Sequence, residues 1–425
     1  MTDSAVIDIR PVTEEDLPAW TRAWGNGYLR PYAEGSVDSI RSAAARDRLI
    51  GAFDRDRCVG TYRSSPQELT VPGGAVLPVS AISRVSVAGT HRRRGLLRRM
   101  VVTDLEEAFA RGEPLAVLDA ARYPLYGRFG FGPATAMAWF EIDVHRAGVD
   151  PLRTGDTSGV LLVDPREYLK AAPGVYERLR AIQPGALRRD EAWWQEATGQ
   201  HVTGSASEGP EPFFALHLDP DTGEADGLLC FDAEETWEAM LPRSPLWVRD
   251  LIAVSPRAEA ALLRYAVTVD WVTAVHLPYR APDTLLPLWL GDPRAARISA
   301  LSDYMWLRIL DAPRSLSART YGVDGSLVLE VADAAGYAAG TWLLEGGPDG
   351  ASCVRTTRGP DLRIQVRDLA SLYLGDDSAT RLAVLGGTEE VRPGALARAD
   401  AMFRTGRRPW SPRAVRGSRY QAGAP

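Results

Sequence analysis

The sequence contains almost no lysine, few cysteines and no long apolar run. Lys170 is the only lysine, so arginine carries nearly all of the positive charge. No stretch of about 18 uninterrupted apolar residues occurs, which argues against a membrane-spanning helix. The start, Met1-Thr2-Asp3-Ser4, lacks the basic segment and apolar run of a secretory signal. These absences predict a cytoplasmic protein that does not act in a membrane.

The sequence also has few residues suited to bind metals or form disulfides. Cys58, Cys230 and Cys353 are odd in number and far apart, which favours reduced thiols over a disulfide framework. The five histidines share no metal-ligand spacing, so we expect no metal site. The formal net charge of −6 disfavours nonspecific binding to nucleic acid. A mildly acidic chain is compatible with a cationic substrate.

What remains is an ordinary globular composition, with 45% hydrophobic and 24% charged residues in a chain of 425. This length suggests roughly three domains. Residues 1–147 alternate strand and helix patterns in the order β-α-α-β-β-β-α-β-α-β, which predicts a mixed sheet with helices on both faces. The strands expected here are Val6–Arg10, Leu49–Phe53, Cys58–Tyr62, Glu68–Val71, Val76–Val87, Leu115–Asp119 and Ala134–Val144. A long amphipathic helix is expected from about Arg92 to Ala110.

The rest of the chain divides in two. Residues 148–296 again show strands followed by a strand and a helix, but without a second Arg/Gly turn, and we interpret them as a degenerate copy of the first domain. Thr236–Met240 is expected to be one of their strands. From about residue 297 the pattern changes, and residues 297–425 are predicted to form a separate α+β domain in which Tyr304–Ile309 is a strand.

The segment from Val85 to Leu97 carries the clearest chemical signal. Its strand, Arg92-Arg93-Arg94-Gly95 turn and amphipathic helix would place an anion at a helix N-terminus, where backbone N–H groups and the helix dipole favour negative charge. Gly95 removes a side chain where a phosphate would approach the backbone. The strand can offer its backbone to an extended ligand. The alternative is an arginine run on a solvated helix end, which the flanking strand and helix make less favourable.

This segment resembles the R/Q-x-x-G-x-G/A motif of the GNAT acetyltransferases, with Arg92, Gly95 and Leu97 at the motif positions. Leu97 departs from the small residue usual there. Further strings are similar to the Eis (enhanced intracellular survival) branch, and they follow in the right order along nearly the whole chain: 126–135 (YGRFGFGPAT), 278–280 (PYR), 292–295 (DPRA), 306–311 (WLRILD), 401–403 (AMF) and 409–410 (PW). The resemblance implies two tandem GNAT-like mixed-sheet domains (1–147 and 148–296), a sterol-carrier-like α+β domain (297–425) and a homohexamer.

The resemblance also assigns the site. It implies transfer of an acetyl group from acetyl-CoA to primary amines of aminoglycoside-like or polyamine substrates. The residues expected to bind acetyl-CoA are Val85, Ser86, Val87, Arg93, Arg94, Gly95, Leu96, Leu97, Arg98, Ala121 and Arg122. The family commonly has Ser-Glu at the last two positions, so only backbone roles carry over there.

Tyr126 matches the general acid of the family. A phenol with a pKa near ~10 is protonated at neutral pH and can donate to a departing thiolate. The family's base is the terminal carboxylate, here Pro425. This chain, however, continues well past Pro409-Trp410, where the family typically stops. Either the tail still delivers the Pro425 carboxylate, or another group is the base, or activity is reduced.

Several alternatives stay open at this point. Trp20, Trp24, Tyr28 and Tyr32 would either wall an amine pocket or pack in the core. The run Trp306–Leu310 would line a lipid tunnel if residues 297–425 acted as a lipid- or sterol-binding domain, although a plain core explains it better. A scaffold that binds CoA without catalysis is the third possibility.

Overall fold

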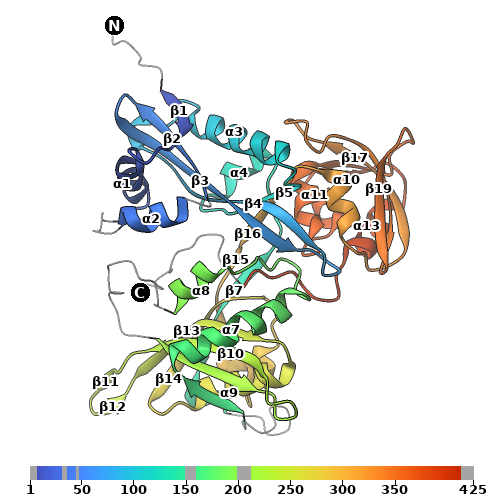
Figure 1. The fold of residues 1–425 in the computed structure, drawn as a ribbon. Coiled ribbons are helices and arrows are strands. Elements are labelled where there is room, and N and C mark those ends of the chain that lie inside the picture. Colours follow the sequence, from blue (N-terminus) through green and yellow to red (C-terminus); the bar gives the residue numbers. More distant parts are fainter. Residues whose placement is uncertain (1–6, 31–35, 45–46, 149–158, 199–211, 413–425) are drawn as a thin grey trace.

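The computed structural model describes residues 7–30, 36–44, 47–148, 159–198 and 212–412. Within them, the strands form two seven-stranded sheets, one five-stranded sheet and a two-stranded hairpin. Each sheet belongs to one lobe of the molecule, and Figure 1 shows the first lobe above the second with the third beside the first. The predicted class of mixed-sheet domains followed by an α+β domain is confirmed.

The first sheet carries the candidate site. Its strands, in spatial order, are β1 (Asp8–Pro11), β2 (Arg48–Asp54), β3 (Arg57–Thr70), β4 (Val76–Val87), β5 (Leu115–Asp119), β16 (Met305–Ile309) and β6 (Gly132–Pro133). Strands β4 and β5 are parallel and are joined by helix α3 (Leu96–Ala110). The flanking helices and turns are α1 (Leu17–Gly27), α2 (Ser36–Ala44), η1 (Gly89–His91), α4 (Tyr123–Tyr126) and η2 (Gly127–Phe129).

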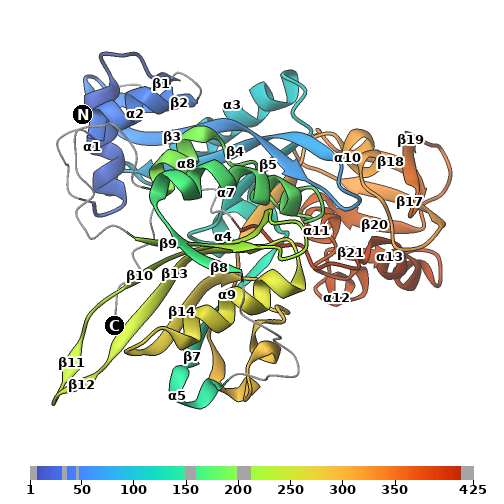
Figure 2. The ribbon, with the colours of Figure 1, turned by 60° about the horizontal axis from the view of Figure 1, so that its bottom comes forward.

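The second sheet repeats this plan. Its strands, in spatial order, are β15 (Ala296–Asp303), β7 (Ala136–Asp143), β14 (Val272–Arg280), β13 (Ser244–Ala253), β10 (Ala225–Ala233), β9 (Phe213–Leu218) and β8 (Val160–Val163). Strands β13 and β14 are parallel and are joined by α9 (Pro256–Thr268), as β4 and β5 are by α3. Figure 2 shows the hairpin of β11 (Trp237–Glu238) and β12 (Leu241–Pro242) extending from this lobe. Its remaining elements are α5 (Val144–Ala147), α7 (Pro165–Arg180), α8 (Glu191–Ala197), η3 (Leu286–Trp289) and η4 (Pro293–Ala295).

The third lobe has one sheet with helices packed on it. Its strands are β19 (Gly350–Arg355), β18 (Gly340–Gly347), β17 (Gly325–Ala332), β20 (Leu362–Gln365) and β21 (Thr388–Glu390). Its helices are α10 (Ala312–Ala318), α11 (Val366–Tyr373), α12 (Ala379–Val384) and α13 (Ala395–Phe403). One continuous apolar cluster extends from this lobe into the first sheet. It contains Leu329 and Phe403 of the third lobe together with Val117 and Leu307 of the first sheet. The first and third lobes therefore share a core.

Two strands cross the predicted borders near residues 147 and 297. Strand β7 precedes the first border but pairs with β14 and β15 in the second sheet. Strand β16 follows the second border but inserts between β5 and β6 of the first sheet. The run Trp306–Leu310 is therefore a fully packed strand in the first lobe, at most 2% exposed on its apolar side chains, and not a tunnel lining in the third.

Three local expectations were wrong for identifiable reasons. The two strands Cys58–Tyr62 and Glu68–Val71 are one strand, β3, because Pro66 lies beyond the end of the β2 ladder and needs no donor on that side. Thr236–Met240 is a strand only at Trp237–Glu238, because Ala239 and Met240 both have positive φ and form the hairpin turn. Helix α3 begins at Leu96 and not at Arg92, because Arg93 and Gly95 are in left-handed conformations.

Candidate active site

The first element of the site is a gap between the parallel strands β4 and β5. Their ladder pairs Val79–Ile82 with Leu115–Leu118, and β4 then continues to Val87 without β5 beside it. The separation follows an irregularity at Arg84, which has a φ of 51° and inserts one extra residue opposite β3. A bulge of this kind increases local twist and re-aims the strand. The backbone of Val85–Val87 is thereby turned toward the gap.

The second element is the N-terminus of α3, directly after this strand. Gly95 is the N-cap with a φ of 76°, and it provides no side chain to cap the helix. In the matching helix α9 of the second lobe, the Ser255 hydroxyl accepts the Ala258 N–H at 3.1 Å, and Pro256 occupies the first turn. The first-turn N–H groups of an uncapped helix are available to an anion. The first lobe therefore presents an anion site that the second lobe has closed.

A cavity of about 1220 Å³ joins these two elements. It is larger than the roughly 300–1,000 Å³ of ordinary small-molecule sites. Of the residues expected to bind acetyl-CoA, all but Arg94 line it: Val85, Ser86, Val87, Arg93, Gly95, Leu96, Leu97, Arg98, Ala121 and Arg122. Residues from β4, from α3 and from the segment after β5 thus meet around one space. Arg94 is exposed and is not among the lining residues.

The cavity is strongly cationic although the chain as a whole is acidic. Among the described residues, its lining has two acids, Glu106 and Asp333, and six arginines: Arg92, Arg93, Arg98, Arg122, Arg128 and Arg367. The Asp333 carboxylate is already neutralised by Arg308 at 2.7 Å. A focused positive field of this kind concentrates anionic ligands. Together with the open helix terminus, it suits a ligand that carries several phosphates.

Tyr126 also lines this cavity, at the C-terminal end of α4. Its side chain is 7% exposed and packs edge-on against Phe131, with 6.1 Å between ring centroids. Tyr123 begins the same helix but is 60% exposed and lies against Trp306. The short helix therefore places one tyrosine in the cavity wall and the other at the surface.

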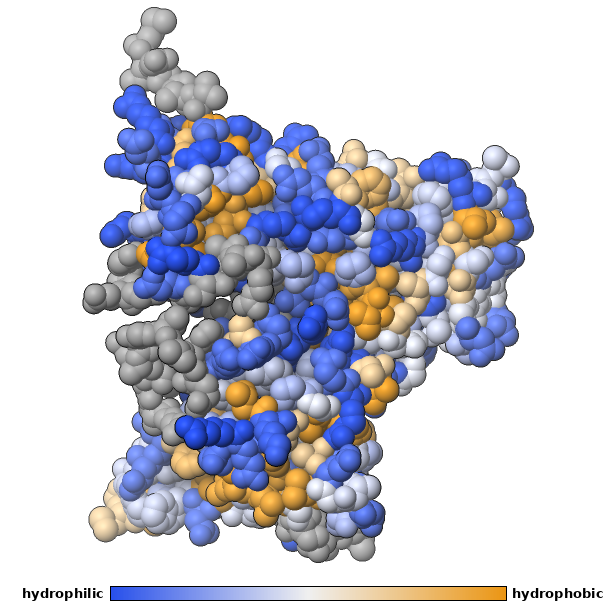
Figure 3. Space-filling model, in the orientation of Figure 1, coloured by the Kyte–Doolittle hydropathy of each residue, from blue (hydrophilic) through white to orange (hydrophobic). Residues whose placement is uncertain are grey.

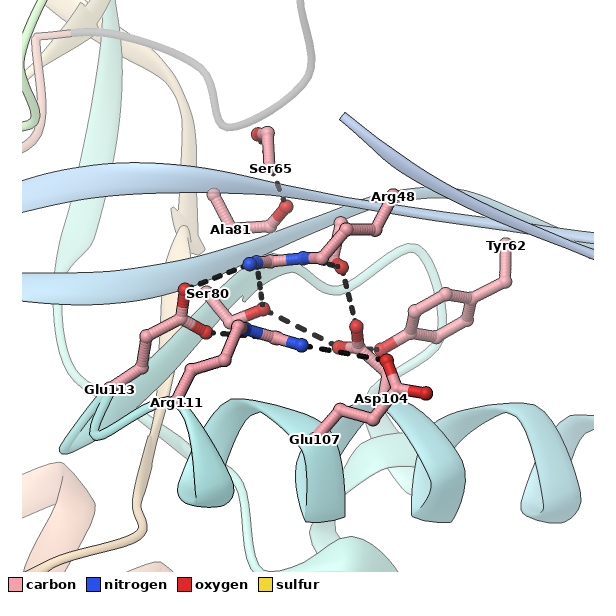
Figure 4. Close-up of polar contacts among 10 residues, drawn as sticks. Arg48, Tyr62, Ser65, Ser80, Ala81, Asp104, Glu107, Arg111 and Glu113 are labelled. Carbon is pink, nitrogen blue, oxygen red and sulfur yellow. Dashed lines mark hydrogen bonds and ion pairs between the residues drawn. The ribbon is translucent and has the colours of Figure 1, made fainter. Parts of the chain in front are cut away.

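A buried polar network holds α3 against the sheet (Figure 4). Asp104 on α3 is fully buried and accepts hydrogen bonds from Tyr62 on β3 at 2.9 Å and from Ser64. Arg48 on β2 donates to Ser64 at 2.9 Å and to Ser80 on β4 at 3.1 Å. Burial is the main cause that raises the pKa of Asp104 above its usual value. The network therefore connects α3, which lines the cavity, to the strands β2, β3 and β4.

This raised pKa predicts a pH-dependent effect of Asp104→Asn. A carboxyl group with a raised folded-state pKa contributes stability below its unfolded pKa, and that stability is lost as pH rises through the folded pKa. Asparagine does not titrate, so the variant should gain stability relative to the parent as pH increases from about 4 to 8. Urea unfolding across this range measures the difference. Glu107→Gln, a change in an exposed carboxyl of the same helix, is the control. A difference for Asp104→Asn that is constant with pH would contradict the prediction.

The other candidate residues lie in different places. Trp20 is a core residue that donates to the Ile50 carbonyl at 3.0 Å, and Trp24 stacks under Arg84 at 4.4 Å. Tyr28 does line the cavity, and its hydroxyl donates to the Val85 carbonyl at 3.3 Å. Tyr32 and Pro425 lie outside the described residues.

The last described residues are fixed against the second lobe. The Trp410 indole N–H donates to the Tyr279 carbonyl at 2.7 Å, and its ring lies 4.6 Å from the Arg280 guanidinium. Arg189 donates to the Pro412 carbonyl at 2.8 Å. Two of the strings that resemble the Eis branch, Pro278–Arg280 and Pro409-Trp410, thus contact each other.

The described part of the chain shows two further features. It contains no cluster of three or more His, Cys, Asp or Glu side chains arranged to hold a metal ion. It also contains no helix long and apolar enough to cross a membrane.

Sequence reasoning missed one wall of the cavity. Eight residues of the third lobe line it: Ala332, Asp333, Ala334, Ala335, Tyr337, Gln365, Val366 and Arg367. None belongs to a motif with a recognisable spacing, so no local signal marks them. The closely spaced glycines of the Tyr126–Thr135 string were the available hint, since glycine often marks a close approach of another backbone.

Comparison with known proteins agrees with this architecture. Models of the acetyltransferase (GNAT) domain match residues 8–134 and 185–309, and a sterol carrier protein domain model matches residues 312–412. An uncharacterized N-acetyltransferase of Streptomyces griseus is 49% identical over 413 residues, covering 96% of this chain and 99% of the relative. N-acetyltransferase Eis of Mycobacterium tuberculosis is 34% identical over 401 residues, covering 92% and 95%.

The solved structures give the same result. Eis1 from Mycobacterium abscessus superposes with a TM-score of 0.81 at 31% identity, covering 96% of this chain and all of that one. A GCN5-related N-acetyltransferase from Anabaena variabilis shares the fold with a TM-score of 0.82 at 21% identity, covering 96% of this chain and 99% of that one. With two GNAT domains, a C-terminal sterol-carrier-like domain and full-length relatives above 30% identity, the chain belongs to the Eis-like family of GNAT N-acetyltransferases.

Proposed function

We propose that this N-acetyltransferase moves an acetyl group from acetyl-CoA to a primary amine of a small cationic substrate of the aminoglycoside or polyamine class. One observation carries the proposal: a single cationic cavity contains the open β4 edge, the uncapped N-terminus of α3 and Tyr126. GNAT acetyltransferases use acetyl-CoA as the donor, and the family implies amine acceptors. The narrower substrate class follows from the likeness to the Eis branch.

The chemical parts of acetyl-CoA fit the cavity in order. The pyrophosphate suits the first turn of α3, where Gly95 leaves open space: beyond its chain neighbours, no atom lies within 4 Å of the point that a Cβ would occupy there. The pantetheine amides suit the backbone edge of Val85–Val87, which β5 does not cover, as in the addition of a strand. The thioester would then lie deeper in the cavity, which Tyr126 also lines.

Direct attack needs two proton transfers. The neutral amine nitrogen attacks the thioester carbonyl and forms the C–N bond, and collapse of the tetrahedral adduct breaks the C–S bond. The leaving thiolate takes a proton from the Tyr126 phenol, and the nitrogen gives up its extra proton to a base. The products are the N-acetyl amide and CoA. Donation by a positioned acid of this kind contributes roughly 10²–10⁴-fold to the rate.

The proposed base is the terminal carboxylate of Pro425. Deleting residues 416–425 should therefore lower kcat by roughly 10²-fold or more, because a general base would be lost. Acetyl transfer by parent and truncated protein, with acetyl-CoA affinity measured beside it, tests this. Alanine replacement of Arg416 and Arg419, which retains the chain end, is the control. Unchanged kcat after truncation would assign the base to another group, and a higher kcat would show that the tail obstructs the site.

The amine-binding side is proposed to lie next to α1. Gly27 and Tyr28, at the C-terminal end of α1, line the cavity, and the Tyr28 hydroxyl reaches the Val85 carbonyl. This places a polar, aromatic surface beside the expected position of the thioester. A cationic amine can be held there by the ring face and by carbonyl oxygens.

The activity is tested with acetyl-CoA, a panel of aminoglycosides and polyamines, and a thiol reagent that detects released CoA. Amine-dependent CoA release, with the acetylated product confirmed by mass spectrometry, is the expected result. No release with any amine, while CoA still binds, would favour a noncatalytic CoA-binding scaffold. Extraction of bound lipid would favour the sterol-carrier alternative.

A homohexamer and a cytoplasmic location complete the proposal. The face shown in Figure 3 is largely hydrophilic but carries scattered apolar patches, and exposed apolar side chains include Leu288 and Leu301. Cys58, Cys230 and Cys353 are buried and no disulfide joins them, which is compatible with a reducing compartment. Light scattering after size exclusion tests the assembly.

A further inference from the structure

The third lobe forms one wall of the proposed acetyl-CoA cavity. The loop after β17 contributes Asp333 and Tyr337, and the start of α11 contributes Arg367. On the opposite side, the cavity is lined by Glu106 from the middle of α3 and by Arg128 after α4. Figure 1 shows one end of α3 next to this orange and red lobe. The cavity therefore extends beyond the helix N-terminus into an interdomain space.

A buried ion pair fixes the loop in this wall. Arg308 on β16 is fully buried and donates to both carboxylate oxygens of Asp333 at 2.7 Å. The same carboxylate accepts the N–H groups of Ala335 at 3.1 Å and Ala338 at 3.0 Å. The Asp333 side chain thus fixes the conformation of the loop, and its partner Arg308 belongs to the first sheet. The buried Arg308–Asp333 pair therefore holds this wall of the cavity in place.

Two glycines allow the lobes to approach this closely. A Cβ at Gly130 would lie 2.9 Å from the Val366 side chain at the start of α11, and that position has a φ of 81°. A Cβ at Gly132 would lie 2.0 Å from the Arg367 carbonyl oxygen. Larger residues would force α11 away from the cavity. Gly130 and Gly132 therefore allow the third lobe to pack against the segment that follows Tyr126.

The chemistry of the interdomain space, with two residues from each lobe, suits a phosphorylated nucleoside. Arg128 and Arg367 are exposed cations lining the cavity, away from the arginines at the start of α3. Phe129 and Tyr337 are half-buried aromatic rings that also line it, and Tyr337 is braced by Phe109 at 5.4 Å between centroids. Guanidinium groups bind phosphate through charge-assisted hydrogen bonds, and aromatic faces stack on bases.

We propose that the space between the first and third lobes binds the nucleotide end of acetyl-CoA. Arg367 of the sterol-carrier-like domain and Arg128 of the first domain hold the 3′-phosphate, and Tyr337 and Phe129, one from each domain, flank the adenine. The inference rests on the proposed use of acetyl-CoA. If the pyrophosphate occupies the α3 N-terminus, the 3′-phosphoadenosine is the part of the molecule left to fill the interdomain end. The third lobe then selects the donor and is part of the transferase site.

The test compares CoA with 3′-dephospho-CoA as calorimetric ligands, so it does not depend on turnover. The parent should bind CoA roughly 10-fold or more tightly than 3′-dephospho-CoA, because 3′-dephospho-CoA lacks the phosphate that accepts the charge-assisted hydrogen bonds of the arginines. Arg367→Ala should remove most of this preference by weakening CoA alone, and Arg367→Lys should restore part of it. Arg381→Ala, an exposed arginine of the same lobe that does not line the cavity, should behave as the parent.

The outcomes separate the inference from the proposed function. An Arg367→Ala variant that keeps the parent's full preference for CoA would overturn the assignment of the 3′-phosphate. A variant that binds CoA normally but has a raised KM for the amine would instead place the acceptor at this wall. Absence of acetyl transfer in the parent would refute the proposed function and leave the binding comparison interpretable.

Discussion

Replacing Tyr126 with Phe should lower kcat roughly 10²–10⁴-fold while the affinity for acetyl-CoA stays within a few-fold. The substitution removes the phenolic proton that the departing thiolate needs. It retains the ring that packs against Phe131, so the short helix α4 should keep its position. Initial rates of CoA release at saturating acetyl-CoA give kcat, and calorimetric titration with CoA measures the binding affinity.

Tyr123→Phe is the matched control, since it makes the same change three residues earlier in the same helix. Tyr123 is 60% exposed and does not line the cavity, so its kcat should match that of the parent. Equal rates for Tyr126→Phe and the parent would remove Tyr126 as the acid. A parallel loss in both variants would indicate that α4 had moved.

Asp333→Ala should lower the free energy of unfolding by about 3–5 kcal/mol, because it leaves the Arg308 guanidinium buried without its partner. It should also weaken CoA binding, since the loop that lines the cavity loses the acceptor of two backbone N–H groups. Urea unfolding and calorimetry measure the two effects.

The surrounding residues supply controls for this change. Glu330→Ala breaks the half-exposed pair with Arg363 in the same lobe and should cost no more than about 1 kcal/mol. Combining Asp333→Ala with Arg308→Met should recover much of the stability, because no unpaired charge stays buried. A double variant as unstable as Asp333→Ala alone would show that the loss came from loop packing and not from the stranded charge.

Most of the residues expected to bind acetyl-CoA line one cavity because they are contiguous in the sequence. One strand, one turn and one helix contain Val85 through Arg98, and the signals for each element are local: alternating apolar residues, Gly95, and the apolar face of α3. Even there the helix start was misplaced by four residues, since arginine at position 93 gives no sign of its left-handed backbone.

The interdomain wall could not be predicted in this way. Trp306–Ile309 is an apolar strand that would fit the interior of any sheet, and nothing in its composition specifies pairing with β5. Its placement depends on contacts distant in sequence, such as Arg308 with Asp333 and Gly132 with Arg367. Once β16 joins the first sheet, the third lobe that follows it must lie beside the cavity.

The insertion of β16 also affects the order in which this protein can fold during synthesis. Leu115 pairs with Ile309, so the interior strand that completes the first sheet leaves the ribosome about 190 residues after β5. At ~5–20 residues per second this delay lasts roughly 10–40 s. During that time β5 exposes an unpaired edge, and unpaired edges promote aggregation. We therefore expect the first lobe to fold after translation, together with the other two, and to benefit from a chaperone that shields the waiting edge.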